Sequence, residues 1–217
     1  MNYVPIAMNK AVASLQQRGR PREFDREEAL GRAMRLFWSR GYEATSVSDL
    51  TKAMGITPPS LYGTFGDKTR LFLEAVDRYQ AGPGVFAQRA LAEEPTAEGA
   101  IRRLLIDAVA AFCDPTQPKG CMVVLAATNC AVESSEVFDA LADRRRAMER
   151  AIRDRIAAGE AVGELAADAD IDVLTGLVAM TLYGLAIKAR DGASRSSLRK
   201  IVEQTMRTWP RAEAITK

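Results

Sequence analysis

The stretch "GITPPSLYGTF", residues 55–65, places two prolines side by side, directly before a Ser-Leu-Tyr that is typical of a helical turn. The first turn of a helix has N–H groups without an intrahelical acceptor, so Pro58 and Pro59 lose nothing there if Thr57 or Pro58 is the cap. Because Pro58 itself precedes a proline, its backbone is pushed away from the α region, and we expect the regular helix to begin at Pro59. Flat proline rings at that helix end can contact a thymine methyl group in the major groove of DNA.

A second stretch suited to nucleic acid lies further upstream. Residues 18–22, "RGRPR", hold three arginines in an extended backbone broken by Gly and Pro, and Arg20 and Arg22 could enter a DNA minor groove. Residues 1–70 carry 11 Lys and Arg against 7 Asp and Glu, whereas the rest of the chain carries 19 against 21. A solvated basic linker explains the arginines equally well, so charge alone leaves both interpretations open.

Several classes of function are disfavoured by what the sequence lacks. It contains no histidine, no glycine-rich phosphate loop, no Cys-x-x-Cys pair and no internal repeat, so we expect no enzyme, no metal site and no cofactor. No window of about 20 apolar residues offers a membrane span; residues 171–187 come nearest but carry Asp172. With no signal peptide and an odd number of cysteines, the chain is expected to be cytoplasmic, with free thiols and no membrane partner.

The elements around the two prolines form a recognisable series. Apolar spacing predicts a helix over residues 25–40, a short second helix that follows the Ser46-x-x-Asp49 capping box, the proline-initiated third helix, and a fourth over 68–79 capped by Asp67. Two short helices joined by a glycine-containing turn and braced by longer ones are typical of a helix-turn-helix.

The segment "TSVSDLTKAMGITPPSLYGTFGDKTRLFLEAV" closely resembles the DNA-binding signature of the tetracycline-repressor (TetR) family, including Leu-Tyr-x-x-Phe and the lysine two residues past the next glycine. The likeness spans residues 24–79, about a quarter of the chain. It implies an all-α protein with an N-terminal three-helix helix-turn-helix domain and a larger C-terminal helical domain. We therefore expect a disordered tail over 1–17, a DNA-binding domain with its arginine arm over 18–66, and an effector-binding and dimerisation domain over 67–217.

The resemblance also assigns roles at the DNA end. It implies base-edge contacts from Thr57, Pro58 and Pro59, with Ser48 as a further candidate, and backbone contacts from Ser46, Ser60, Tyr62, Thr64 and Lys68. Small hydroxyls and helix N-termini suit phosphates, whereas specificity requires groups at base edges. Gly63 and Thr64 depart from the family pattern, in which many relatives carry an aromatic residue and a histidine. A half-buried aromatic that braces the motif remains an alternative interpretation of Tyr62.

The C-terminal half is predicted to be helical throughout. "TAEGAIRRLLIDAVAAFCDP" forms an amphipathic helix that Asp-Pro ends, and "CMVVLAATNCAV" forms a buried one. Ser135 opens a long charged helix, whose Arg144 to Arg146 are interpreted as a solvated face rather than an anion site. In the resembled family the last two helices pair with those of a second subunit, and a homodimer would read a palindromic operator. The expected dimer residues are Leu174, Leu177, Val178, Leu198, Ile201, Val202, Thr205, Met206 and Trp209.

Regulation in this family is typically by a small molecule bound in the second domain, which implies a repressor that an effector releases from its operator. The candidate ligand residues, each of which core packing also explains, are Phe112, Cys121, Met122, Leu125, Thr128, Asn129, Met180 and Tyr183. The scarcity of buried charge favours an apolar or neutral effector. Two alternatives stay open: a helical small-molecule-binding protein without DNA function, and a regulator that senses electrophiles or oxidants through Cys113, Cys121 or Cys130, although Lys119 is the only cation nearby in sequence.

Overall fold

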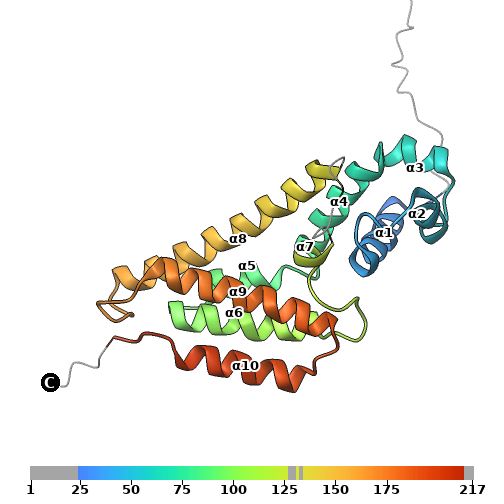
Figure 1. Cartoon of the computed structure of the whole chain (residues 1–217). Helices are drawn as coiled ribbons and strands as arrows, with labels where there is room; N and C mark the ends of the chain where they lie inside the picture. The colour runs from blue at the N-terminus through green and yellow to red at the C-terminus, as the bar shows by residue number, and fades with distance from the viewer. Residues whose placement is uncertain (1–23, 127–130, 132–133, 213–217) are drawn as a thin grey trace, which may run out of the picture.

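The computed structural model describes residues 24–126, 131 and 134–212. Within these residues the chain forms ten α-helices and a single isolated β-bridge between Leu165 and Arg211 (Figure 1). The predicted tail over 1–17 lies outside the described residues. The helices are α1 (Arg26–Arg40), α2 (Val47–Met54), α3 (Pro58–Phe65), α4 (Lys68–Ala81), α5 (Phe86–Glu93), α6 (Ala97–Phe112), α7 (Met122–Leu125), α8 (Ser135–Ala161), α9 (Ile171–Arg190) and α10 (Arg195–Arg207).

Helices α1–α4 form a compact head at one end of the molecule (Figure 1). Helix α1 packs against α4 and α2, and an aromatic cluster fills the space between them. Phe37 meets Phe72 edge to face at a centroid distance of 5.0 Å, and Tyr42 meets Phe72 at 5.1 Å. Such edge-to-face pairs stabilise beyond the area they bury, so the head has a well-defined core despite its small size.

The core of the head is completed by residues far along the sequence. Met122, Val123 and Ala126 of the α7 segment pack into it, as do side chains from the first turns of α8. Two hydrogen bonds fix this junction: the Tyr42 N–H donates to the Ala126 carbonyl at 2.8 Å, and the Trp38 indole N–H donates to the Gly120 carbonyl at 3.2 Å. The predicted boundary at residue 66 therefore crosses one continuous packed cluster, since α4 and α7 both belong to it.

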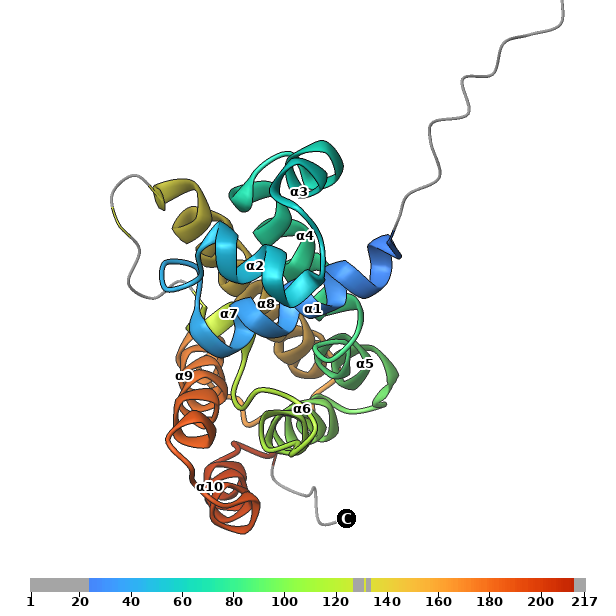
Figure 2. The same ribbon diagram turned by 90° about the vertical axis from the view of Figure 1, so that its right-hand side faces the viewer.

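The larger C-terminal domain is built around α6. This helix packs against α5, α8, α9 and α10, and its Ile101, Leu104 and Leu105 are completely buried. Figure 2 shows α9 and α10 at the outer edge of the domain, with no other helix outside them. The all-α, two-part architecture expected from the sequence is confirmed.

Three elements differ from the sequence predictions. Helix α5 was not predicted, because its alanine-rich sequence follows Pro83 and two glycines and carries no side-chain cap. The buried helix predicted for residues 121–132 is described only as the single turn Met122–Leu125. Helix α3 begins at Pro58 rather than Pro59, because Thr57 takes the cap position and leaves both prolines in the first turn.

The predicted dimer stripe on α10 needs correction. Its apolar side chains Leu198, Val202 and Met206 belong to the core of their own protomer, so they cannot supply area to a contact between subunits. The same holds for Trp209, which follows α10, and for Val178 of α9. Leu174 is also buried, and Thr205 is half-buried with its hydroxyl donating to the Ile201 carbonyl at 3.1 Å. Among the predicted set, only Leu177 and Ile201 expose large apolar side chains.

A different stripe lies on the outer face of α9. Val173, Leu177, Met180 and Ile187 recur at helical spacing and are 65%, 36%, 66% and 48% exposed. Helix α9 is long and apolar enough to cross a membrane by length and composition, but its opposite face packs against α6, α8 and α10 within the C-terminal domain. Helix α9 therefore combines a buried face with an uncovered apolar face.

Candidate nucleic-acid interface

The turn between α2 and α3 is set by local chemistry. Gly55 adopts the left-handed conformation with φ of 70°, which glycine reaches without a steric penalty, and its N–H donates to the Thr51 carbonyl. Thr57 then caps α3: its hydroxyl accepts the Ser60 N–H at 3.4 Å and lies 2.9 Å from the Ser60 hydroxyl. The entry angle of α3 is thus fixed by a glycine, a cap and two prolines.

Helix α3 has one anchored face and one open face. Leu61 and Phe65, four residues apart, are 0% and 3% exposed and hold the helix in the core of the head. Pro59 and Tyr62 point outward, and Tyr62 is 51% exposed. Leu61 and Phe65 therefore provide the anchor of α3, while Tyr62, with about half of its surface open to solvent, keeps both predicted roles, a DNA contact and a half-buried brace.

Gly63 lies on the same open face. A methyl group placed on its α-carbon would meet no atom of the protein within 4 Å, so the fold itself does not require a glycine here. Glycine inside a helix costs about 1 kcal/mol relative to alanine. Gly63 therefore leaves space on the outer face of α3 and lowers the stability of this helix relative to alanine.

The start of α2 is held by a reciprocal capping box. The Ser46 hydroxyl accepts the Asp49 N–H at 3.0 Å, and Asp49 accepts the Ser46 N–H at 3.1 Å. Hydrogen bonds from Ser46, assisted by Arg40 at 3.5 Å, lower the pKa of the Asp49 carboxyl. Ser48 is exposed beside this cap, as the prediction of a base contact requires.

Lys68 begins α4 next to the end of α3. Its ammonium lies 4.0 Å from the centroid of the Tyr42 ring, and this cation–π contact places a positive charge at the N-terminal end of a helix. The guanidinium of Arg26 lies 4.8 Å from the Phe65 ring and bonds Glu74 at 2.5 Å, which ties α3 to α1 and α4. Positive charge and helix N-terminus together favour an anion such as a phosphate.

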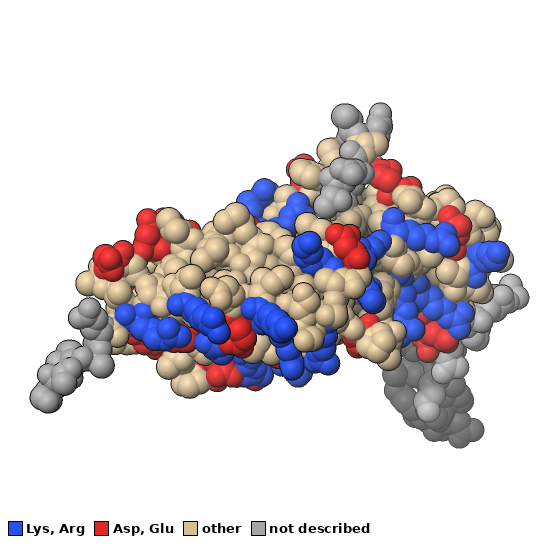
Figure 3. Space-filling model, turned by 60° about the horizontal axis from the view of Figure 1, so that its bottom comes forward, with Lys and Arg blue, Asp and Glu red and all other residues tan. Residues whose placement is uncertain are grey.

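The predicted DNA contacts that the structure describes lie on α2, α3 and α4 of the head. Ser46 and Ser48 lie at the start of α2, Lys68 at the start of α4, and the remaining six along α3: Thr57, Pro58, Pro59, Ser60, Tyr62 and Thr64. Arg20 and Arg22 lie outside the described residues. Charge by itself would not have identified this surface. Figure 3 shows basic side chains gathered at the head end and in a second row across the C-terminal domain.

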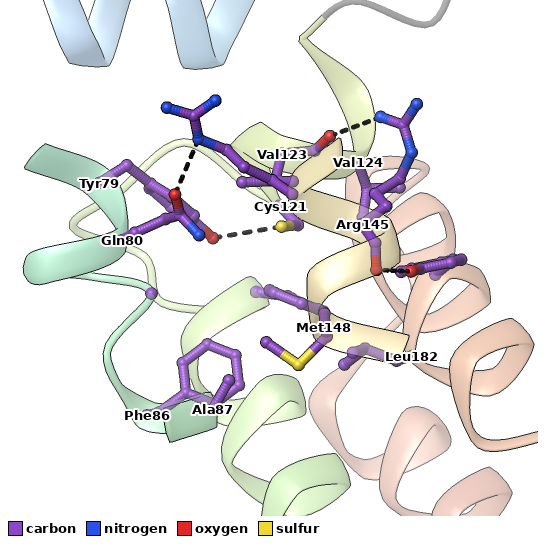
Figure 4. Close-up of a pocket in the computed structure, with 14 residues that line it drawn as sticks. Tyr79, Gln80, Phe86, Ala87, Cys121, Val123, Val124, Arg145, Met148 and Leu182 are labelled. Carbon is purple, nitrogen blue, oxygen red and sulfur yellow. Dashed lines mark hydrogen bonds between the residues drawn. The ribbon is translucent and has the colours of Figure 1, made fainter. Parts of the chain in front are cut away.

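A second candidate site is a pocket between α4 and the C-terminal domain. It has a volume of about 60 Å³ (Figure 4). Of the predicted ligand residues it contains Phe112, Cys121 and Tyr183. Met122 packs in the core of the head and Leu125 against the C-terminal core, away from the pocket lining. Met180 is 66% exposed on the outer face of α9, so its assignment to the pocket was wrong. Thr128 and Asn129 lie outside the described residues.

The sequence analysis missed most of the pocket wall. Gln80 from α4, Phe86 and Ala87 from α5, and Arg144, Arg145 and Met148 from α8 all line it. The interpretation of the arginine run as a solvated face holds only for Arg146, which is 56% exposed and pairs with Asp143. Successive side chains of a helix point in different directions, so three adjacent arginines cannot all face the same neighbour. The sequence does not tell which of them faces the pocket, because this depends on how α8 packs.

The pocket cysteine is not an activated thiol. The Tyr79 hydroxyl donates to the Cys121 sulfur at 3.5 Å, and burial raises the pKa of both groups. Arg145, rather than the predicted Lys119, is the cation that acts on Cys121, and burial outweighs it. Since the thiolate is the nucleophile, a raised pKa disfavours Cys121 as an electrophile or oxidant sensor. Cys113 is half-buried and unpaired, and Cys130 lies outside the described residues.

Comparison with known proteins agrees with this geometry. The model of bacterial regulatory proteins of the tetR family matches residues 29–75, and that of the tetracyclin repressor-like C-terminal domain matches residues 97–205. The HTH-type transcriptional repressor ComR of Escherichia coli (strain K12) is 34% identical over 196 residues, covering 90% of this chain and 93% of ComR. The HTH-type transcriptional repressor BdcR of the same strain is 28% identical over 180 residues, covering 83% of this chain and 86% of BdcR.

A solved structure extends the likeness to three dimensions. A cysteine mutant of the TetR family transcriptional regulator CifR, complexed with 26 bp double-strand operator DNA, superposes with a TM-score of 0.85 at 44% identity; the match covers 88% of this chain and 100% of that one. With a helix-turn-helix head, a helical second domain and relatives that match nearly end to end, this chain belongs to the tetR family of transcriptional regulators.

Proposed function

We propose that this protein is a cytoplasmic, homodimeric repressor that binds a palindromic operator and is released from it by a small molecule. The observation that carries the proposal is the open face of α3, on which Pro59 and Tyr62 face solvent while Leu61 and Phe65 anchor the helix. Support comes from CifR, whose structure was determined on double-strand operator DNA. ComR and BdcR, both named as repressors, support repression rather than activation.

The apolar stripe of α9 supports the dimer. An uncovered row of large apolar side chains on a soluble regulator marks a surface for association, and the row here consists of Val173, Leu177, Met180 and Ile187. Gly176 and Gly184 lie beside and within the row, and a methyl group at either would meet no protein atom within 4 Å. Glycines on the same face let two helix backbones approach closely, so we place the dimer contact on α9, with Ile201 of α10 at its edge.

A dimer also explains how so short a recognition helix could be specific. Helix α3 has 8 residues, too few to read a long sequence alone. Two copies related by two-fold symmetry would read two half-sites about one helical turn of DNA apart or a multiple of it, and the operator would then be a palindrome.

The pocket supports control by a ligand. Its wall includes Tyr79 and Gln80 in the last turns of α4, the helix whose first residue, Lys68, lies next to α3. A molecule that enters the pocket therefore presses on the same helix that positions the DNA-reading end.

The test is selection of binding sequences from random duplex DNA by the purified protein at two salt concentrations. We expect a palindrome whose affinity falls as salt rises, because each phosphate contact releases counterions. Tyr62→Ala and Lys68→Ala should weaken binding to all sequences, while Pro59→Ala should change the preference among them. If no sequence is enriched even at low salt, the helix-turn-helix is only a scaffold and the chain is a small-molecule-binding protein.

A further inference from the structure

Arg144 links α8 to α4 at the rim of the pocket. Its guanidinium donates to Asp77 at 2.5 Å, to Gln80 at 3.0 Å and to the Ala140 carbonyl at 3.2 Å. All three nitrogen atoms of Arg144 are therefore engaged, two of them with side chains of α4. These bonds use three of the five N–H groups of the guanidinium, and the one to Asp77 is made to an exposed carboxylate that another anion could replace.

The pocket lining is unbalanced in charge. It includes Arg144 and Arg145 and no carboxylate. Asp77, the partner of Arg144, is outside the lining and 68% exposed, and Glu149 accepts the Tyr183 hydroxyl at 3.0 Å without lining the pocket. Among the described residues of the lining, an anion in the pocket would thus meet positively charged side chains and no carboxylate.

The lining combines polar and apolar groups. Figure 4 shows Gln80 and Arg145, with Val123 and Val124 between them, toward one end of the pocket, and Phe86 and Ala87 toward the other, with Met148 between the two ends. Phe112 and Leu182 add to the apolar part. This distribution fits a molecule with a charged head and a short apolar body.

We propose that the pocket binds a small organic anion, a short-chain monocarboxylate, whose head displaces Asp77 from Arg144. Asp77 returns to solvent at little cost because it is already exposed, whereas the ligand head gains a charge-assisted pair in a less solvated place. The volume of about 60 Å³ limits the body to a short chain. This replaces the sequence-based expectation of an apolar or neutral effector and rests on the proposed function as a ligand-released repressor.

Displacement of Asp77 has a consequence for the head. Asp77 and Gln80 lie on α4, and Arg78 of the same helix is paired with Glu27 of α1, while Glu74 is paired with Arg26. When Arg144 releases α4, the C-terminal domain loses its charged contact with a helix that is tied to the rest of the head. The ion pair of Arg144 with Asp77 is thus a latch that the ligand opens.

The experiment is calorimetric titration of the full-length protein with propanoate and with propan-1-ol, which has the same chain length and no charge. We expect propanoate to bind roughly tenfold more tightly than propan-1-ol, and Arg144→Gln to lose most of that difference. Arg144→Lys keeps the charge without the fork and should fall between the two. Arg146→Gln, on the same helix but turned to solvent, is the matched control and should bind like the wild type.

A second measurement separates this proposal from the proposed function. Asp77→Asn should bind propanoate more tightly than the wild type, because the latch is already weakened. Equal affinities for propanoate and propan-1-ol, or unchanged propanoate affinity in a folded Arg144→Gln, would overturn the anion site. Propanoate binding through Arg144 by a protein that enriches no duplex sequence would support the anion site and overturn the repressor function instead.

Discussion

The head and the C-terminal domain solve opposite problems. In the head, caps, a left-handed glycine and edge-to-face aromatic pairs fix each helix end, and the open face of α3 is presented on an anchored helix. The C-terminal domain has an uncovered stripe on α9, and it shares with α4 a pocket and the ion pair of Arg144 with Asp77, which we propose that a ligand opens. The difference indicates that a surface that reads another molecule needs rigidity, while a domain that responds to one needs internal space and alternative partners.

The largest expected effect tests whether the buried face of α3, which stabilises the head, is independent of the open face that we propose contacts DNA. Leu61→Ala removes a completely buried side chain and should lower the free energy of unfolding by about 2–5 kcal/mol. Its neighbour Tyr62 is 51% exposed, so Tyr62→Ala should change stability by less than about 0.5 kcal/mol while weakening DNA binding. Urea unfolding and binding to the selected duplex measure the two effects. Equal loss of stability in both variants would contradict the division of α3 into two faces.

The next effect concerns the stripe of α9. Met180→Glu places a charge in the centre of the proposed dimer contact and should weaken self-association at least tenfold, or about 1.4 kcal/mol. Val162→Glu is the control, because Val162 is 73% exposed at the end of α8 and is not part of the stripe. Sedimentation equilibrium measures both. A Met180→Glu protein that remains as dimeric as the control would place the interface elsewhere.

A smaller effect tests why Gly63 is retained. Gly63→Ala should raise the free energy of unfolding by about 1 kcal/mol, because alanine is the better helix former and the methyl group meets no protein atom. If the open face of α3 lies close to the DNA backbone, the same variant should bind the operator less tightly. A more stable variant with unchanged DNA affinity would show that nothing approaches α3 at this position.

The smallest effect lies in the C-terminal domain and depends on pH. Hydrogen bonds from Arg211 first, and then Arg102, hold the pKa of Glu98 below its ordinary value of 4.5. A carboxyl group whose pKa is lowered by folding stabilises the fold above the unfolded value, and this contribution disappears as the pH falls through the folded value. Glu98→Gln should therefore cost about 0.5–1 kcal/mol at pH 7 and nothing in strong acid. A difference that persists at low pH would mean that packing, not charge, is lost.

What could be predicted from the sequence follows the same division. The caps at Ser46, Thr57 and Asp67 depend on neighbours within three residues, so residue type and spacing sufficed. The pocket could not be predicted, because it joins α4, α5, α8 and α9, and whether Arg144 faces Asp77 or solvent depends on how α8 packs.

The stripes of α9 and α10 show the same limit. Both helices have apolar rows at helical spacing, yet the α10 row is buried in its own protomer and one α9 row is not. Spacing identifies an apolar face but does not tell which neighbour covers it.

The seating of α7 in the head has a consequence for engineering new switches. Tyr42 and Trp38 are bonded to the Ala126 and Gly120 carbonyls, and Met122 fills the core beneath them. Consider a chimeric regulator in which the first four helices of this chain are joined to the effector-binding domain of another. In that protein a foreign loop would replace the residues 120–126 that pack against the head. Successful grafts should therefore carry residues 120–126 together with the head, so that specificity for DNA is transferred as two separate pieces of sequence.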